Sequence, residues 1–343
     1  MIMDQKIPII LCIDVEPDGF FIDRTKPLPW KGYEGAYSYF GVLREQFARV
    51  TGSLVHFNWF CRVDQQVEEA YGSADWAFTH YSKFVEDLEK QGDEIGLHPH
   101  AYRWVPESNH WIEDLGNQEW VNHCVEMGFS AYKKLFGRHC DSFRFGAYWM
   151  SSETINLLER MGARFDLTVE PGLNVKKRYF PNQFYSDGVP SHEGAPHYPY
   201  RPSRTDFRKP DLERKDGIWM IPLSTGTVTF KFGRLETAYK KLFQSEDLKP
   251  RLIPLNLGRG NNGFSTVMNE LVHSLERPYL AMVVRSDVCG EQVADLSHAE
   301  NMKKNIEYLL NHPLRDRFVF STPGEAMEMM GYVKAAEGAI AHS

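Results

Sequence analysis

Short runs rich in β-branched and aromatic residues alternate with longer stretches of helical periodicity along most of this chain. The predicted strands are Ile7–Asp14, Ser53–Cys61, Glu94–His100, Ser142–Ala147, Arg164–Val169, Ile218–Ser224, Tyr279–Ser286 and Phe318–Ser321. The predicted helices lie between them: Tyr37–Val50, Trp76–Gln91, Gln118–Phe136, Ser152–Met161, Thr266–Ser274 and Ala299–Asn311. Strands that alternate with helices indicate a mostly parallel sheet covered by helices.

About seven or eight such units in one chain favour an α/β fold with a closed or nearly closed barrel. An open doubly wound sheet is the alternative, but no glycine-rich phosphate loop follows any predicted strand. We expect one domain over residues 1–334 and a flexible tail over 335–343. The segment Glu170–Asp216 breaks the alternation and is rich in Pro, Tyr, Arg and Lys. A loop of that length is usually functional or a lid.

Charge and cysteine usage exclude several protein classes. The net charge of -7 argues against a protein built to bind nucleic acid. No run of about 18 consecutive apolar residues is present, so no membrane span is expected. The apolar segment Ile7–Ile13 is short and precedes acidic residues, which is unlike a secretory signal. The five cysteines are scattered and form no CxxC pair, so we expect reduced thiols and a cytoplasmic protein.

Two predicted strands end in pairs of residues that can bind a metal. Asp14 and Glu16 follow the first strand, and His98 and His100 follow the third. The members of each pair are two residues apart and therefore point to the same side of an extended backbone. Two carboxylates on one side repel unless a cation or a proton lies between them. Solvated carboxylates and structural histidines are the alternative, but together the pairs favour a catalytic site for a divalent metal, zinc especially.

A third strand end carries Arg144, followed closely by Gly146. An arginine within a buried strand needs a carboxylate partner, and Asp14 would be such a partner. Glycine permits a close backbone approach, and the neighbouring N–H groups could face an oxyanion.

In combination, these motifs resemble the first three motifs of the NodB-homology polysaccharide deacetylases, carbohydrate esterase family 4. The motifs are Asp14-Val15-Glu16, Glu94-Ile95-Gly96-Leu97-His98-Pro99-His100 and Phe143-Arg144-Phe145-Gly146-Ala147. Further segments fit the same family: Trp59–Asp64, Phe165–Val169, Pro199–Ser203 and Phe320–Glu325. The resemblance covers about residues 7 to 330 and is closest to the WbmS-like subgroup, which is associated with the synthesis of bacterial surface polysaccharides.

The resemblance implies a distorted (β/α)7 barrel in a single domain and a divalent metal, usually zinc. Asp14 resembles the catalytic base, and Arg144 resembles the arginine that orients this base. Glu16 takes the place of the metal-binding carboxylate, and His98 matches the first metal-binding histidine.

The sequence departs from the family at two places. The family's second metal-binding histidine lies four residues after the first, where this chain has Tyr102, and His100 is the nearest replacement. The family's late Leu-His motif supplies a general acid, but this chain has Arg285-Ser286-Asp287 on the corresponding strand. Either Asp287 and Arg285 substitute for that acid, or His192 or His197 of the long loop supplies it.

Residues near these motifs and in the long loop are predicted to contact the substrate. They are Arg62, Asp64, Tyr102, Tyr148, His197, Tyr200 and Arg201. Aromatic rings in the loop either cover the barrel mouth or stack on sugar faces. Its cations are either solvated or hold a phosphate of an activated sugar.

The predicted function is that of a metal-dependent hydrolase that removes an N-acyl group from an amino sugar, with Asp14, Arg144 and Asp287 as catalytic residues. One alternative is a barrel metal hydrolase that acts on a cyclic amide or formamide. Such enzymes place their His-x-His after the first strand, whereas here it follows the third. The other alternative is a non-catalytic carbohydrate-binding barrel that has lost its acid.

Overall fold

The computed structural model describes residues 5–19, 22–24, 26–174, 191–230, 249–274, 278–290 and 296–334. Its centre is a curled parallel sheet with the order β11-β1-β2-β3-β6-β7-β8, and β12 also pairs with β1. The bounds are β1 Ile7–Val15, β2 Asn58–Cys61, β3 Glu94–Leu97, β6 Ser142–Phe143, β7 Phe165–Asp166, β8 Trp219–Met220, β11 Leu280–Arg285 and β12 Phe318–Phe320. The described residues therefore form a single α/β domain of the predicted barrel type.

Strand β1 pairs with three other strands of this sheet. Its residues Ile9 to Asp14 pair with β11, while Cys12 to Val15 pair with β2 and Ile7 to Ile9 pair with β12. The gap between the outer strands β8 and β11 is bridged by backbone hydrogen bonds: Ser224 N–H donates to Ala281 O at 2.8 Å, and Leu257 N–H donates to Val283 O at 2.9 Å. These contacts bring the sheet close to a full barrel.

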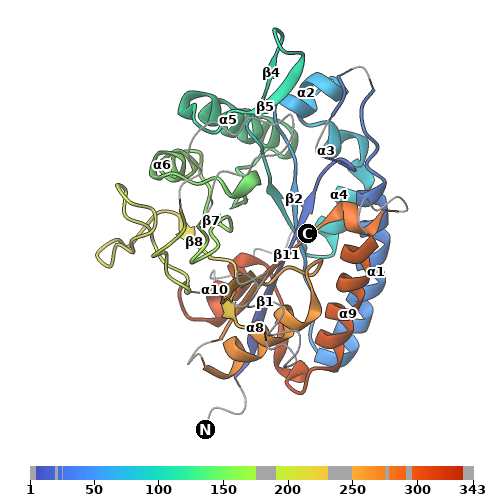
Figure 1. Cartoon of the computed structure of the whole chain (residues 1–343), viewed down its shortest axis with the longest axis vertical. Helices are drawn as coiled ribbons and strands as arrows, with labels where there is room; N and C mark the ends of the chain where they lie inside the picture. Colours follow the sequence, from blue (N-terminus) through green and yellow to red (C-terminus); the bar gives the residue numbers. More distant parts are fainter. Residues whose placement is uncertain are drawn as a thin grey trace, which may run out of the picture.

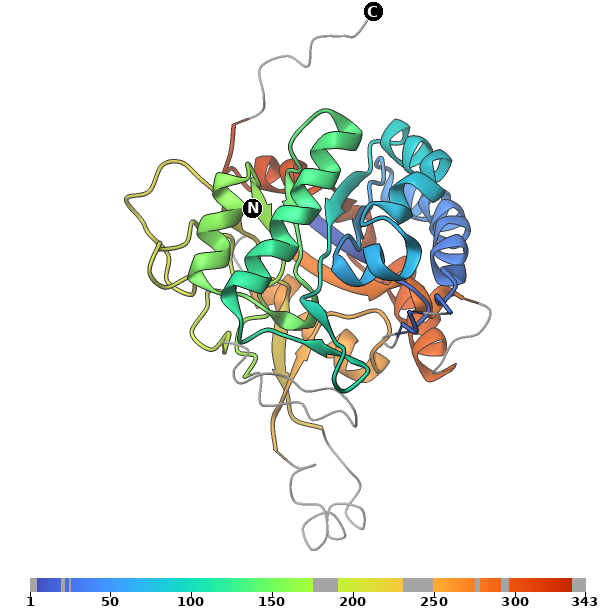
Figure 2. The same ribbon diagram turned by 90° about the horizontal axis from the view of Figure 1, so that it is seen from above.

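Helices surround the sheet (Figures 1 and 2), and α1 and α9 run side by side along one flank. Their bounds are α1 Lys31–Thr51, α2 Gln65–Tyr71, α3 Trp76–His80, α4 Ser82–Lys90, α5 Gln118–Phe136, α6 Ser152–Arg160, α8 Asn261–Ser274, α9 Leu296–Asn311 and α10 Pro323–Met329. Short 3-10 turns follow β6 (η1, Gly146–Tyr148) and β11 (η3, Ser286–Cys289), and a third, η4 (Arg315–Arg317), precedes β12.

Every predicted strand and helix has a counterpart, but several boundaries were wrong. The predicted helix Trp76–Gln91 is two helices, because the backbone bends at Tyr81 (φ -106°, ψ 32°). Helix α1 begins at Lys31 rather than Tyr37, because Asp18 accepts hydrogen bonds from the N–H groups of Lys31 and Gly32 at 2.8 Å. Side chains distant in the sequence thus decide where an element starts.

Among the described residues, the sequence patterns missed four strands and two α-helices. The strands form two antiparallel pairs: β4 (Tyr102–Val105) with β5 (His110–Glu113), and β9 (Thr225–Val228) with β10 (Arg251–Pro254). The helices are the short α2 and α10, each seven residues long. Residues 175–190 of the predicted long loop and the predicted tail 335–343 lie outside the described residues.

The two faces of the sheet pack into different cores. Ile9, Leu11 and Ile13 of β1 belong to the core beneath the surrounding helices. Ile10 and Cys12 belong to a second core, together with Ala281 and Val283 of β11. Because side chains alternate along a strand, Asp14 continues the row of Ile10 and Cys12 and faces the barrel interior.

Helix α1 packs against η3 with almost no side chain between them. A Cβ built on Gly32 would lie 2.5 Å from Asp287 Cα, and one built on Gly35 would overlap Cys289 O. Since the two backbones approach this closely, glycine is required at these positions. The contact fixes the turn that carries Asp287.

Two glycines of α1 provide a matched test of this contact. Gly32→Ala is expected to lower the free energy of unfolding by about 1–3 kcal/mol, the usual cost of overpacking. Gly41→Ala is the control, because its Cβ would meet nothing within 4 Å and alanine favours a helix interior by about 0.5–1 kcal/mol. Chemical denaturation measures both variants. Equal stability of the two would show that α1 and η3 are not tightly packed.

Candidate functional site

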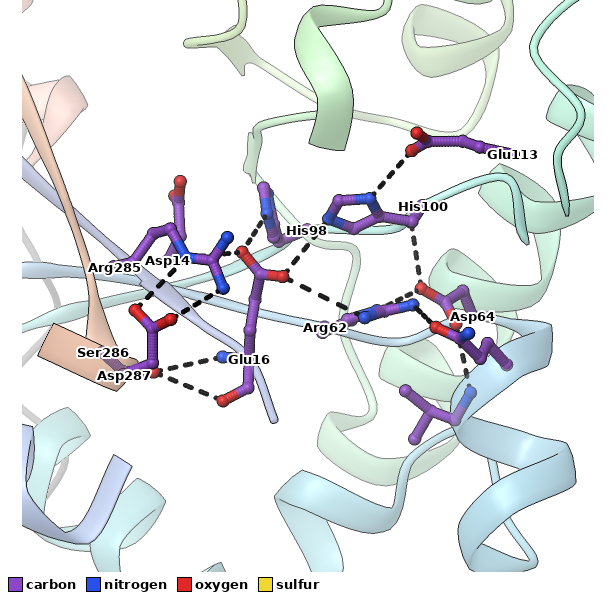
Figure 3. Close-up of polar contacts among 12 residues, drawn as sticks. Asp14, Glu16, Arg62, Asp64, His98, His100, Glu113, Arg285, Ser286 and Asp287 are labelled. Carbon is purple, nitrogen blue, oxygen red and sulfur yellow. Dashed lines mark hydrogen bonds and ion pairs between the residues drawn. The ribbon is translucent and has the colours of Figure 1, made fainter. Parts of the chain in front are cut away.

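Polar side chains gather at the carboxyl ends of β1, β2, β3 and β11 (Figure 3), and Arg144 follows directly after β6. Glu16 and His98 come directly after the strands β1 and β3, and each continues the row of side chains that faces inward. Phe60 fills the barrel interior below them. A Cβ on Gly96 would lie 2.7 Å from its ring, so glycine leaves the room that this ring occupies. The strand geometry thereby brings together residues separated by more than eighty positions in the sequence.

Glu16, His98 and His100 form the centre of this cluster. Their potential ligand atoms all lie within 4.8 Å of one another, and all three residues are buried. The Nε2 atoms of His98 and His100 each lie 3.5 Å from a different carboxylate oxygen of Glu16. The structure therefore brings together the three residues that the sequence predicted as metal ligands.

Each imidazole is oriented through its other nitrogen. His98 Nδ1 lies 2.8 Å from the backbone carbonyl of Arg144, and His100 Nδ1 lies 3.1 Å from Glu113 Oε1. Both of these partners accept hydrogen bonds, so each Nδ1 carries the proton. Such outer contacts are typical of metal-binding histidines because they fix the tautomer with Nε2 directed at the metal.

Guanidinium groups flank Glu16 on two sides. Arg285 Nε lies 3.8 Å from its Oε1, and Arg62 Nη1 lies 4.0 Å from its Oε2. Burial opposes ionisation of Glu16, but Arg285 and the two imidazoles outweigh burial and hold its pKa well below the usual range. Burial and Arg62 likewise oppose a proton on His100, but the nearby carboxylates of Glu113 and Glu16 outweigh them and raise its pKa to about 9.

Two observations show that this cluster fits a divalent metal. Glu16 Oε2 and His100 Nε2 are buried and have no hydrogen-bond partner. Buried polar atoms normally have one, so a ligand is expected between them. The charged groups of the site also leave an excess of one negative charge with His100 protonated, and of two once both imidazoles are neutral as metal ligands. They are the carboxylates of Asp14, Glu16, Asp64, Glu113 and Asp287 and the guanidiniums of Arg62, Arg144 and Arg285.

Asp14 and Arg144 form the ion pair that the sequence predicted. Arg144 Nε donates to the two carboxylate oxygens of Asp14 at 3.0 and 3.2 Å, and its Nη1 donates to Leu167 O at 2.7 Å. Both side chains are buried. The Asp14 carboxylate is therefore held in one orientation at the barrel mouth.

Asp287 stands on η3, beside the same cluster. Arg285 donates to its two carboxylate oxygens at 2.9 and 3.2 Å. Burial raises the pKa of Asp287, Arg285 partly opposes this shift, and Glu16 adds to it. Ser286 anchors the turn to β1, because its hydroxyl accepts a hydrogen bond from Glu16 N–H at 3.2 Å. The residues that replace the family's Leu-His motif thus lie next to the metal-ligand cluster.

Three of the predicted substrate-binding residues belong to the wall of this cluster. Arg62 and Asp64 are fully buried and pair with each other at 2.8 Å. Asp64 also accepts hydrogen bonds from His100 N–H and from Val67 N–H at the start of α2. Tyr102 stacks on His100, with ring centroids 5.5 Å apart. These side chains hold the site in place, and their contact with substrate stays a prediction.

The other predicted substrate-binding residues lie in different places. Tyr148 lines a cavity of about 710 Å³ together with Glu170, Arg259 and Lys304. His197 Nδ1 is 3.5 Å from the Thr225 hydroxyl.

Tyr200 is buried, and its hydroxyl donates to Phe207 O at 2.8 Å. Arg201 stacks over Trp219 at the amino end of β8, so the structure does not bring it to the metal-ligand cluster. His192 is buried, and its Nδ1 accepts a hydrogen bond from Glu170 N–H at 3.1 Å.

Sequence reasoning missed Glu113, and it predicted a close backbone approach at Gly146 without identifying His100 as the neighbour. Glu113 ends a strand whose partner begins at Tyr102, and only the pairing of β4 with β5 carries it back to His100. A Cβ on Gly146 would lie 2.3 Å from His100 Nε2, so this glycine makes room for a predicted metal ligand. The signal for the hairpin was the turn-forming stretch Pro106–Asn109 between two short runs with aromatic residues.

Neither a protein-family model nor a curated protein sequence matches this chain. Among solved structures, a proposed glycoside hydrolase/deacetylase from Parabacteroides distasonis aligns over 95% of this chain and 72% of its own, with 17% identity and a TM-score of 0.53. The chain has the fold of this protein. The resemblance to deacetylase barrels that the sequence motifs indicated is thereby confirmed for the fold.

Two further solved structures align less closely. A proposed polysaccharide deacetylase from Mycobacterium smegmatis shares 10% identity over 96% of this chain and 91% of its own, with a TM-score of 0.45. A proposed polysaccharide deacetylase involved in O-antigen biosynthesis from Bordetella bronchiseptica shares 11% identity over 92% of this chain and 84% of its own, with a TM-score of 0.33. Among the described helices, none has the length and apolar character needed to cross a membrane.

Gly146→Ala tests the geometry of the metal-ligand cluster. The added methyl group would meet three ring atoms of His100 at 2.3–2.5 Å, so the imidazole must move away from Glu16. We expect the affinity for Zn²⁺ to fall by at least about tenfold, as for other changes that misplace a ligand. Isothermal titration calorimetry measures the change. Gly324→Ala is the control, because its Cβ meets only ordinary contacts at 3.8–4.0 Å. Unchanged affinity in Gly146→Ala would exclude His100 as a ligand.

Proposed function

We propose that this protein is a metal-dependent hydrolase that removes an N-acyl group, in particular an N-acetyl group, from an amino sugar. We further propose that the metal is zinc and that the sugar belongs to the synthesis of bacterial surface polysaccharides. One observation carries the proposal: the buried Glu16, His98 and His100 converge within 4.8 Å at the barrel mouth to which the oriented Asp14–Arg144 pair also belongs. This combination supplies metal ligands and a base in one site.

Glu16, His98 and His100 would hold the metal. A divalent metal bound there acts as a Lewis acid, which polarises the amide carbonyl and makes water a better nucleophile. Asp14 accepts a proton from the attacking water, because its carboxylate is oriented by Arg144 and faces the barrel mouth. Arg144 keeps this base in one orientation through its second hydrogen bond, to Leu167 O.

Groups in the wall of the site stabilise the oxyanion and protonate the leaving amine. Gly146 N–H already donates to Pro99 O at 2.9 Å, so we assign stabilisation of the oxyanion to the metal and to another backbone N–H near Gly146. Asp287 donates a proton to the leaving amine, a role that its raised pKa favours. The products are a free amino sugar and a carboxylic acid.

Metal binding is tested with His98→Ala. Purified wild-type protein is expected to contain about one equivalent of zinc or another divalent metal, and this variant should lose it, because one of three protein ligands is removed. Elemental analysis gives the metal content. His273→Ala is the control, since this exposed histidine is bonded only to Asn269 O of its own helix. Equal metal in wild type and His98→Ala would remove the proposed site.

The base is tested with Asp14→Asn. Acetate release from N-acetylated amino sugars, free and nucleotide-linked, should fall by about 100-fold or more, the usual contribution of a positioned base. Metal content should stay near that of wild type, because Asp14 pairs with Arg144 rather than with the imidazoles. Loss of metal in this variant would make Asp14 a ligand. Metal binding by wild type without any hydrolysis would instead support the non-catalytic sugar-binding barrel.

A further inference from the structure

Glu113 is a buried carboxylate outside every motif that predicted the site. It is the last residue of β5 and is 1% exposed. Its Oε1 lies 3.1 Å from His100 Nδ1, and its Oε2 is buried without a hydrogen-bond partner. Burying a carboxylate costs free energy unless a partner compensates it. His100 is the partner of Glu113 in this structure.

The two imidazoles of the cluster are oriented in different ways. His98 donates to a backbone carbonyl that follows β6, which the barrel itself fixes. His100 lies beyond the end of β3, where no strand pairing holds it. Its backbone N–H donates to Asp64 at 3.0 Å, and its ring lies between Tyr102 and Gly146. These contacts limit where the ring lies but leave its two nitrogens exchangeable by a ring flip. Only a partner at one nitrogen decides which nitrogen faces Glu16.

We propose that Glu113 is a positioning residue of the metal site, and that the β4–β5 hairpin is therefore part of that site. This inference rests on the proposed function and deepens it. The Glu113 carboxylate accepts a hydrogen bond from His100 Nδ1–H and thereby keeps Nε2 directed at the metal. A carboxylate partner also makes the imidazole a stronger ligand than a neutral partner would. The hairpin thus completes a ligand set that the barrel strands alone leave unfinished.

The hairpin explains why a side chain, rather than a backbone carbonyl, orients His100. In the resembled family the second histidine lies four residues after the first, where this chain has Tyr102. Tyr102 instead begins β4 and pairs with Glu113 across the hairpin, in register. Tyr102, which stands at the position of the family's second histidine, therefore places Glu113 beside His100 through the pairing of β4 with β5.

The test compares Co²⁺ binding by wild type and Glu113 variants, followed by the visible absorption of the bound metal. Glu113→Ala removes the acceptor and is expected to raise the dissociation constant about 10–100-fold, with an altered absorption band. Glu113→Asp keeps the charge but shortens the reach by one methylene, so it should weaken binding as well. Glu113→Gln keeps an acceptor at the same reach and should bind more tightly than Glu113→Ala.

Asp114→Asn is the matched control on the same hairpin. Asp114 follows Glu113 in the chain, is also buried, and pairs with Arg103 at 2.7 Å rather than with a histidine. Its loss should lower the melting temperature without changing Co²⁺ affinity. A purely structural Glu113 would behave in the same way as this control.

The outcomes separate the two proposals. If wild type binds Co²⁺ and both Glu113→Ala and Glu113→Asp bind it equally well, Glu113 does not position the ligand, while the proposed function stands. If wild type binds no Co²⁺, the metal site and the proposed function fail together. Should Glu113→Ala fail to fold, the comparison of Glu113→Asp with Glu113→Gln gives the result, because both keep a polar group at the buried position.

Discussion

The Glu16 carboxylate lies between two imidazoles and two guanidiniums inside the mouth of the barrel. A charge at this depth is tolerable only when its neighbours compensate it, so each surrounding side chain is constrained in turn. Arg62 pairs with Asp64, and Arg285 pairs with Asp287. The ends of β1, β2, β3 and β11 are thereby connected through one set of ion pairs, and the described part of the barrel mouth is organised around it.

Close backbone approach is the second constraint that shapes the site. Gly146 lets the His100 ring lie against the turn after β6, and Gly32 lets helix α1 lie against the turn that carries Asp287. In each case a methyl group would overlap an atom of the site or of its support. Interiors packed at this density transmit such shifts, so the positions of the ligand and of the proposed acid depend on residues without side chains.

The motif departures have a consistent structural result. The replacement of the expected second histidine by Tyr102 coincides with a hairpin that returns Glu113 to His100. The replacement of the late histidine coincides with an Arg285–Asp287 pair that contacts Glu16 through Arg285. Both changes keep the number of charged groups around the cluster high, and both shift the support of the site from the strands to the turns and the hairpin that follow them.

The sequence by itself determined the barrel class, the order of the barrel strands along the chain, and the pairing of Asp14 with Arg144. It could do so because residues two apart on a strand share one face, and because the carboxyl ends of parallel strands meet at one edge. It could not find Glu113, the capping of α1 by Asp18, or the identity of His100 as the side chain that lies against Gly146. Each of these depends on a contact between segments whose separation in space has no period in the sequence. Only the tertiary structure decided them, because packing distances between backbones, rather than local propensity, select those residues.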